Sequence, residues 1–314
     1  MNILLIIAGL LLILAGANYM TDGSAALAKR FSISEFVIGL TVVAVGTSAP
    51  ELVVSVMSAL KGSGAMAIGN VVGSNIFNTY VILGICAAFI PIHLTRKNMR
   101  IDIPMGILVS TILLLVCLGG TIHRIYGVVM LLIYIAIILF SIKSSRAQGV
   151  QAPQVPQEDA SGIKSMPLWL ALALTLGGLG ALIYGGNIFL EGAVNLAREF
   201  NISDNVIAIT LLAGGTSLPE LAASVVSIIK GKSDIALGNV IGSNIANILL
   251  VLGASSIITP LEMGTITLSD ILVVLGGSAL LYLMGYILVR NVISKIEGAI
   301  MIAAYAVYIY LLLA

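Results

Sequence analysis

The chain has 314 residues, of which 15 are basic, 14 are acidic and 59% are hydrophobic, and its formal net charge is +1. So few charges cannot cover the surface of a water-soluble protein of this length, and a nearly neutral chain offers no basic surface for nucleic acid. The composition therefore excludes a soluble enzyme and a nucleic-acid-binding protein. It predicts an all-α integral membrane protein whose surroundings are the lipid bilayer.

A helix needs about 20 predominantly apolar residues to cross roughly 30 Å of hydrocarbon. Taken in chain order, ten stretches qualify: 3–20, 37–60, 65–91, 103–122, 125–142, 167–190, 205–229, 235–260, 271–289 and 292–313. The polar segment 144–165 separates the fifth stretch from the sixth. We therefore predict a first half, 1–143, and a second half, 166–314, with five transmembrane helices each.

The positions of Lys and Arg indicate the orientation, because cytoplasmic loops carry an excess of them. With ten spans, one side receives Lys29, Arg30, Arg96, Lys97, Arg100, Lys143, Arg146, Lys164, Lys230, Lys232, Arg290 and Lys295. The other side receives Lys61, Arg124 and Arg198. The distribution predicts that segment 144–165 lies in the cytoplasm and that both termini lie outside the cell (inner) membrane.

The two halves contain an internal repeat. A shift of 169 residues places 37–84 over 206–253 without a gap, and 26 of the 48 aligned positions are identical. Because each half has an odd number of spans, the second copy enters the membrane from the opposite side. Such inverted repeats are typical of secondary transporters, whose binding site lies near the membrane midplane. The alternative is a duplication that only enlarges a membrane scaffold, which would not concentrate the identity at polar positions.

Two acidic residues lie in the middle of predicted spans. Glu51 ends the motif G-T-S-A-P-E at 46–51, and Glu220 ends the equivalent motif G-T-S-L-P-E at 215–220. An ionisable side chain at this depth is costly, at least about 2.5–3.5 kcal/mol, and indicates a functional site. If the repeat brings the two carboxylates together, the pair must bind a cation or take up protons.

The residues around the glutamates favour a cation. A proline inside a helix removes a backbone hydrogen bond and clashes with the preceding turn, so we expect Pro50 and Pro219 to break helices 2 and 7 at a central ion site. The break frees backbone carbonyls around 44–47 and 213–216, next to the hydroxyls of Thr47, Ser48, Thr216 and Ser217. Such hard oxygen ligands suit Ca²⁺ or Na⁺. The alternative is that each Pro-Glu turn only kinks its helix and that the carboxyl group is protonated.

The following span of each half carries G-N-x-x-G-S-N-I-x-N, at 69–78 and 238–247. Its G-x-x-x-G spacing also serves helix packing. Packing does not explain Ser74 and Asn78, which share one helix face, or their equivalents Ser243 and Asn247. We predict that these four side chains add oxygen ligands, whereas Asn70 and Asn239 are expected to satisfy local backbone groups.

The two motifs, present in both halves, resemble the α-repeats of the cation/Ca²⁺ exchanger superfamily, and most closely its prokaryotic Na⁺/Ca²⁺ exchangers. The resemblance implies a Ca²⁺ site formed by Glu51 and Glu220 with the backbone carbonyls of Thr47 and Thr216. It also implies Na⁺ sites that use Ser48, Ser217, Ser74 and Ser243, the carbonyls of Ala44 and Ala213, and the nearby Asn78 and Asn247. The transported ions would be Ca²⁺ and Na⁺, with no cofactor, and a monomer would suffice because one chain holds both halves of the site.

One position departs from many relatives. The family often has an aspartate where this chain has Asn247, and in the K⁺-dependent branch that aspartate is associated with the use of K⁺. We therefore predict a K⁺-independent antiporter that exchanges Ca²⁺ for Na⁺ by alternating access, with spans 1 and 6 moving against the core. The alternatives are an H⁺-coupled antiporter of Ca²⁺ or another divalent cation such as Mn²⁺, a passive channel, and an intramembrane hydrolase. The hydrolase requires two aspartates in a water-filled site, one of them in a Gly-x-Gly-Asp setting, and the chain has no such motif.

Overall fold

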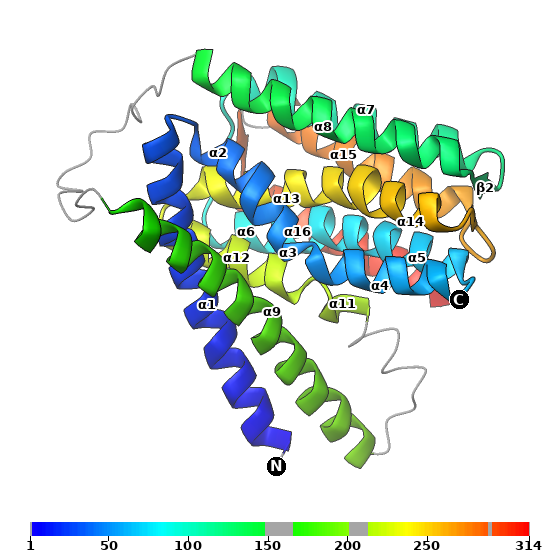
Figure 1. Cartoon of the computed structure of the whole chain (residues 1–314), viewed down its shortest axis with the longest axis horizontal. Coiled ribbons are helices and arrows are strands. Elements are labelled where there is room, and N and C mark those ends of the chain that lie inside the picture. Colours follow the sequence, from blue (N-terminus) through cyan, green and yellow to red (C-terminus); the bar gives the residue numbers. More distant parts are fainter. Residues whose placement is uncertain (1, 148–165, 201–212, 288–290, 314) are drawn as a thin grey trace.

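The computed structural model describes residues 2–147, 166–200, 213–287 and 291–313 (Figure 1). The helices of the first half are α1 (Asn2–Phe31), α2 (Glu35–Ile38), the π-helical η1 (Gly39–Val43), α3 (Ala44–Thr47), α4 (Ala49–Leu60), α5 (Gly64–Ile76), η2 (Phe77–Ile82), α6 (Leu83–Phe89), η3 (Asn98–Asp102), α7 (Ile103–Cys117) and α8 (Arg124–Ala147). The helices described in the second half are α9 (Leu168–Glu199), α11 (Ala213–Gly215), α12 (Leu218–Ile229), α13 (Ser233–Ala246), η5 (Asn247–Leu252), α14 (Gly253–Ile258), α15 (Leu268–Ile287) and α16 (Lys295–Leu313).

The protein is a multi-pass helical membrane protein. In the described ranges, 8 helices are long and apolar enough to cross a membrane, and the bent pair Glu35–Thr47 and Ala49–Leu60 raises the number to 9. The remaining predicted span, 205–229, begins outside the described residues, and its described part ends in the shorter apolar helix α12. Helix α8 continues through Ala147 into the predicted linker, and 148–165 also lie outside the described residues.

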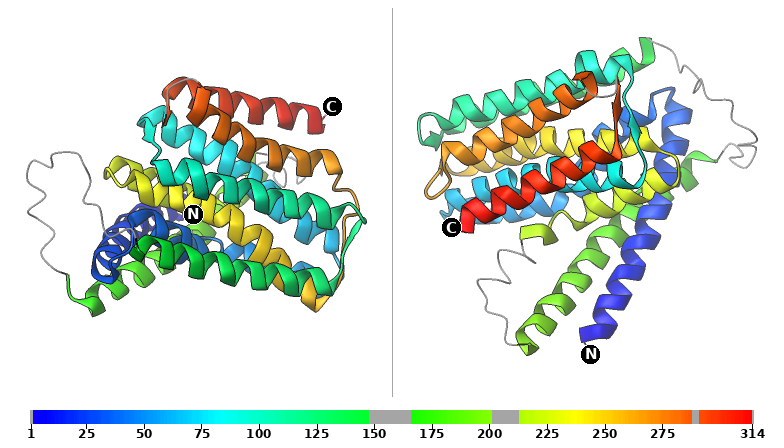
Figure 2. Two further views of the ribbon diagram at one scale, coloured as in Figure 1. Left: turned by 90° about the horizontal axis from the view of Figure 1, so that it is seen from above. Right: turned by 180° about the vertical axis from the view of Figure 1, so that it is seen from behind.

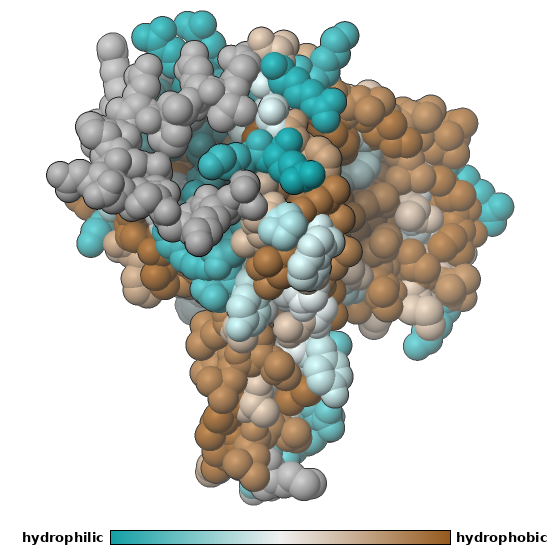
Figure 3. Space-filling model, turned by 60° about the vertical axis from the view of Figure 1, so that its left-hand side comes forward, coloured by the Kyte–Doolittle hydropathy of each residue, from teal (hydrophilic) through white to brown (hydrophobic). Residues whose placement is uncertain are grey.

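The repeated third spans form the centre of the molecule. In the most apolar part of Ser233–Ile258, 89% of the residues are buried, compared with 72% for Gly64–Phe89 and 17% for Lys295–Leu312. Helices α1 and α9 lie side by side and cross the stack of the other helices obliquely (Figures 1 and 2). Hydrophobic residues cover much of the outer surface, including the projecting part of the α1–α9 pair (Figure 3). This surface matches a bilayer, since water would require polar groups there.

In the described part of the chain, four two-residue strands, which the sequence analysis did not predict, join loops of the two halves. β1 (Ile92–His93) pairs antiparallel with β4 (Val292–Ile293), and β2 (Thr121–Ile122) pairs antiparallel with β3 (Leu261–Glu262). The shift of 169 residues carries β1 onto β3, so the two sheets join equivalent loops. Each sheet links the loop after the third span of one half to the loop before the last span of the other.

Glycines allow α1 and α9 to approach with their backbones in contact. A Cβ atom added at Gly178 would lie 2.5 Å from the backbone nitrogen of Met20 and 2.7 Å from the carbonyl oxygen of Gly16. A Cβ atom at Gly9 would lie 2.8 Å from the carbonyl oxygen of Gly185. Since 9 and 16 align with 178 and 185 under the repeat, the crossing of the two helices is itself nearly symmetric. Small residues at such positions are the usual means of close helix packing in membranes.

Gly178→Ala is expected to destabilise the protein by about 1–3 kcal/mol, because the new methyl group meets backbone atoms that cannot move aside. Gly177→Ala is the matched control, because nothing lies within 4 Å of a Cβ atom there. Thermal unfolding in detergent compares the two variants. Equal midpoints would contradict the close contact of α1 with α9.

Candidate ion-binding site

Both halves contain the predicted helix break. In the first half, α3 ends at Thr47, Ser48 has φ −80° and ψ 8°, and Pro50 lies in the first turn of α4. The two segments are bent by 47°. In the second half the break falls between α11 and α12, where Ser217 has φ −90° and ψ 8° and Pro219 lies in the first turn of α12. Proline is tolerated in a first turn because no intrahelical partner is needed there.

The break places each glutamate in the first turn of a new helix. Glu51 lies at the start of α4 and Glu220 at the start of α12, and both side chains are fully buried. A helix N-terminus stabilises negative charge through its unpaired N–H groups and its dipole. Both carboxylates are therefore held inside the protein by helices that the prolines restart.

The two glutamates are connected by reciprocal hydrogen bonds between the repeats. The hydroxyl of Ser217 donates to Oε1 of Glu51 at 3.1 Å, and the hydroxyl of Ser48 donates to Oε1 of Glu220, also at 3.1 Å. Each serine lies three residues before the glutamate of its own repeat but bonds to that of the other. The structure thus brings the two motifs together, as the repeat predicted.

The third spans supply further polar groups, but not symmetrically. The hydroxyl of Ser74 donates to Oε1 of Glu51 at 3.2 Å. Its equivalent, Ser243, instead lies 3.5 Å from the hydroxyl of Thr47, which also donates to Oδ1 of Asn239 at 3.1 Å. The link from Thr47 to Asn239 was not predicted, because it joins residues of different repeats.

Asn70 and Asn239 have the structural role that the sequence suggested. The amide of Asn70 donates to the carbonyl oxygen of Glu51 at 3.2 Å and to the hydroxyl of Ser55 at 3.0 Å. The amide of Asn239 donates to the carbonyl oxygen of Glu220 at 3.3 Å and to the hydroxyl of Ser224 at 3.0 Å. These bonds fix the third span of each half against the helix that carries the glutamate.

Several buried oxygen atoms at the site lack a hydrogen-bond partner. They are Oε2 of Glu51, Oε2 of Glu220, Oγ1 of Thr216, Oδ1 of Asn247 and Oδ1 of Asn78, whose Nδ2 is also unpartnered. Buried polar atoms are normally hydrogen-bonded, so such a set requires an explanation. Carboxylate, hydroxyl and amide oxygens of this kind are the ligands that hard cations take.

Asn78 and Asn247 lie in π-helical segments: Asn78 is in η2, and Asn247 begins η5. π-helical segments are rare in proteins, and those that occur are often at functional sites. The extra residue per turn redirects side chains and carbonyl groups. The amide of Asn247 donates to Oδ1 of Asn75 at 3.2 Å. The π-helical geometry was not predicted, since the sequence continues as an ordinary apolar helix.

The two backbone carbonyl groups predicted as Na⁺ ligands, those of Ala44 and Ala213, are not described equally by the structure. The carbonyl oxygen of Ala44 accepts a hydrogen bond from the N–H of Ser48 at 3.0 Å and lies 3.4 Å from the hydroxyl of Thr47, whose single proton has the shorter contact with Oδ1 of Asn239. It is therefore engaged in this conformation. Ala213 is the first described residue of α11, and its side chain lies outside the described part of the chain.

Residues 1–143 and 170–314 match the family model described as sodium/calcium exchanger protein. The chain belongs to the sodium/calcium exchanger family. It is 35% identical over 274 residues to the inner membrane protein YrbG of Escherichia coli (strain K12), which covers 84% of this chain and 82% of that protein. It is 30% identical over 350 residues to the sodium/calcium exchanger MaX1 of Methanosarcina acetivorans, covering 99% and 98%.

The fold also matches a solved exchanger. The sodium-calcium exchanger NCX_Mj, soaked with zero Na⁺ and Ca²⁺, superposes with a TM-score of 0.86 at 31% identity, covering 99% of this chain and 98% of that one. The resemblance inferred from the two motifs is therefore confirmed. The protein is an antiporter of a family that transports Na⁺ and Ca²⁺, and it is not an enzyme.

Glu51→Gln and Glu220→Gln are each expected to weaken Ca²⁺ binding by at least roughly a hundredfold, because losing one charge of a buried ionic interaction costs about 3–5 kcal/mol. Glu262→Gln is the control, because Glu262 is an exposed carboxylate in strand β3. Isothermal titration calorimetry of the purified protein measures the effect. Ordinary Ca²⁺ affinity in Glu220→Gln would exclude a site shared by both glutamates.

Proposed function

We propose that this antiporter exchanges Ca²⁺ for Na⁺ at one central site and does not use K⁺. The observation that carries the proposal is the buried pair Glu51 and Glu220. Each carboxylate is bonded through one oxygen to a serine of the other repeat, and its second oxygen has no partner. Two buried carboxylates surrounded by neutral oxygens form a site for hard cations.

The charge of the pair explains how the two ions are coupled. Two unit charges about 5 Å apart repel by roughly 3 kcal/mol at an effective dielectric constant of about 20. One Ca²⁺ neutralises both carboxylates, and Na⁺ ions that use the same carboxylates exclude Ca²⁺. An empty site leaves two buried negative charges, so switching between the two sides is disfavoured without a cargo. The protein therefore switches between the two sides of the membrane with either Ca²⁺ or Na⁺ bound. Movement of Ca²⁺ in one direction is thereby coupled to movement of Na⁺ in the other.

The proposed ligand set contains oxygen atoms from both repeats. Side-chain or backbone oxygens come from Glu51, Glu220, Thr47, Thr216, Ser48, Ser217, Ser74, Ser243, Asn78, Asn247, Ala44 and Ala213. The unpartnered oxygens of the glutamates and asparagines support this assignment most directly. The carbonyl of Ala44 accepts the N–H of Ser48, so it binds Na⁺ through its second lone pair.

We further propose ten spans in two inverted repeats, 1–143 and 166–314, with the linker 144–165 in the cytoplasm and both termini outside the inner membrane. The reciprocal serine–glutamate bonds and the two equivalent strand pairs support a two-fold relation between the halves. In this arrangement α1 and α9 move together against the remaining helices and expose the site to one side at a time. A monomer suffices, because both halves of the site come from one chain.

An H⁺-coupled divalent antiporter is the second candidate. It is favoured by the unpartnered carboxylate oxygens of Glu51 and Glu220, because a carboxylate binds protons as well as metal ions. Serine hydroxyls facing both carboxylates favour Na⁺, because a proton needs no additional oxygen ligands.

Ca²⁺ uptake into proteoliposomes distinguishes the candidates. We expect an outward Na⁺ gradient to drive Ca²⁺ uptake, while K⁺ and H⁺ gradients of the same size have little effect. If more than two Na⁺ replace one Ca²⁺, a membrane potential also drives uptake, by about 2.3 kcal/mol per charge for each 100 mV. Uptake driven by a pH gradient and indifferent to Na⁺ would reject the proposal in favour of H⁺ coupling.

Asn247→Asp adds a third carboxylate to the site and removes the hydrogen bond from Asn247 to Oδ1 of Asn75. We expect this variant to gain sensitivity to K⁺ or inhibition by protons, measured as Ca²⁺ uptake over a series of K⁺ concentrations and pH values. Asn78→Asp is the matched comparison, because the Asn78 side chain lacks a hydrogen-bond partner. Unchanged K⁺ and pH responses in Asn247→Asp would remove the basis for K⁺ independence.

A further inference from the structure

The repeat relates two charged pairs at opposite ends of the molecule. The shift of 169 residues places Glu191 over Asp22 and Lys230 over Lys61. Asp22 lies on α1 and Lys230 follows α12, whereas Glu191 lies on α9 and Lys61 follows α4. Each pair thus combines the first helix of one half with the second span of the other half.

We propose that these pairs are alternating latches for the exchange cycle. The pair Asp22–Lys230 holds the cytoplasmic side closed in the state described here, and the pair Glu191–Lys61 forms on the outward side when the protein switches. The inference rests on the proposed alternating-access function and names the residues that bias its two states.

The cytoplasmic pair is formed in the structure. Nζ of Lys230 lies 2.5 Å from Oδ1 of Asp22 and donates to the carbonyl oxygen of Asn18 at 3.0 Å. One turn deeper, the hydroxyls of Thr21 and Ser227 are 3.0 Å apart and buried. Helix α1 is therefore attached to the end of α12 by two layers of polar contacts.

The outward pair is not formed. Lys61 and Glu191 are both exposed, and among the described residues neither takes part in an ion pair. The N-terminal end of α1 and the C-terminal end of α9 project away from the helix stack, whereas the C-terminal end of α1 lies against α2 (Figures 1 and 2). The two sides of the molecule thus differ although their sequences match.

The contacts of α9 with the helix breaks also differ between the two halves. Leu190, the equivalent of Thr21, lies against the helix break of the second half: a Cβ atom added at Gly215 would be 2.7 Å from Cδ2 of Leu190. The equivalent contact in the first half would join Thr21 to Gly46, but a Cβ atom added at Gly46 would lie 2.5 Å from Cδ1 of Leu179 on α9. Both helix breaks therefore meet α9, and the α1–α9 pair is placed asymmetrically between the two halves.

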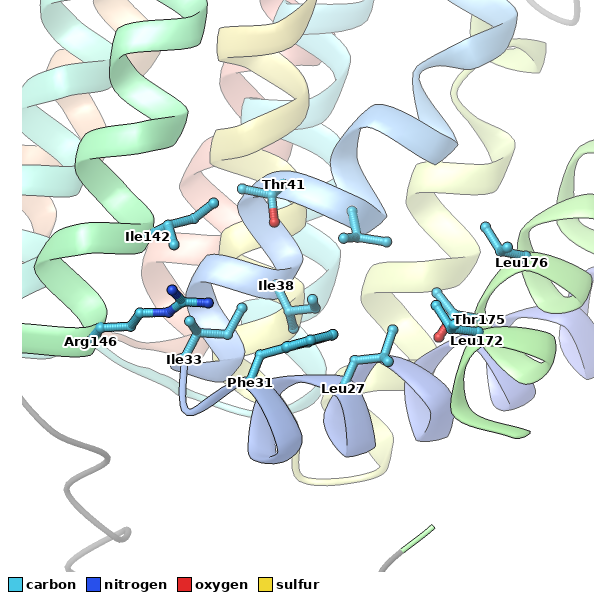
Figure 4. Close-up of a pocket in the computed structure, with 11 residues that line it drawn as sticks. Leu27, Phe31, Ile33, Ile38, Thr41, Ile142, Arg146, Leu172, Thr175 and Leu176 are labelled. Carbon is cyan, nitrogen blue, oxygen red and sulfur yellow. The ribbon is translucent and has the colours of Figure 1, made fainter. Parts of the chain in front are cut away.

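Among the described residues, no ion pair joins α1 or α9 to the first half at the cytoplasmic end. A cavity of about 280 Å³ separates α1 and α9 from α2, η1 and α8, with a mainly apolar lining that includes Phe31, Ile38, Ile142 and Leu176 (Figure 4). Apolar contact is non-directional and permits sliding. Directional contacts such as Asp22–Lys230 can therefore distinguish one position of the pair from the other.

The first test removes one charge from each pair. An exposed ion pair contributes at most about a fivefold change in an equilibrium. Asp22→Asn is therefore expected to move the ratio of inward- to outward-facing protein up by about two- to fivefold, and Glu191→Gln to move it down by a similar factor. The apparent Ca²⁺ affinity on each side scales with the population that faces that side. Sided Ca²⁺ transport assays in oriented vesicles measure the ratio of the two apparent KM values.

Opposite shifts of the two variants support the latches, because general destabilisation does not reverse its sign between the two sides. Shifts in the same direction, or no shift in either variant, would overturn the proposal. The exchanged pair Asp22→Lys with Lys230→Asp provides a check, since it restores the attraction and is expected to return the ratio toward that of the native chain.

The second test needs no ion gradient. A short bifunctional thiol reagent is applied to two double variants, Asp22→Cys/Lys230→Cys and Lys61→Cys/Glu191→Cys. The native chain is the control, because its two cysteines, Cys86 and Cys117, are buried. Both double variants are expected to cross-link, the first immediately and the second more slowly. Failure of the second to cross-link overturns the latch proposal even if Na⁺-driven uptake is normal. Absence of Na⁺-driven uptake with normal cross-linking instead rejects the proposed function alone.

Discussion

The arrangement of this antiporter depends on two carboxylates buried at the contact of its two repeats. An isolated charge inside a membrane protein is costly, so each must be held by donors and by a helix N-terminus. Each break in the second span provides both, since the restarted helix carries the glutamate and the serine before it reaches the glutamate of the other repeat. The repeats therefore complete one another, and neither half alone forms the site.

The other helices hold the two glutamate-bearing motifs against each other. The first helix of each half, α1 and α9, lies outside this central group. The third spans are the most buried helices, and Asn70 and Asn239 bond them to the backbone of the glutamates. The helices α1 and α9 instead pack on each other through glycines and lie obliquely over the rest. A buried centre crossed obliquely by a separate helix pair is the arrangement on which the proposed alternating access depends.

Much of the site could be predicted from the sequence because the residues are repeated. Glu51 and Glu220 were identifiable as buried charges in apolar stretches, and Pro50 and Pro219 as helix breaks. The exchange of serines between repeats was not predictable, since residues 48 and 220 are far apart in the chain. The π-helical turns at Asn78 and Asn247 were also hidden, because a π-turn differs from an α-turn in geometry and not in residue pattern.

The sequence by itself determined that this is a helical membrane protein, which family it resembles, and which two carboxylates lie at its centre. These properties follow from local hydropathy and from a motif repeated in one chain. Only the tertiary structure decided which partners the polar groups take and which of the two equivalent charged pairs is formed. Equivalent residues such as Asp22 and Glu191 have equivalent sequence surroundings, yet Asp22 forms an ion pair with Lys230, whereas Glu191 forms none with the described residues. A repeated sequence is symmetric by construction, whereas a working conformation of a transporter must break that symmetry.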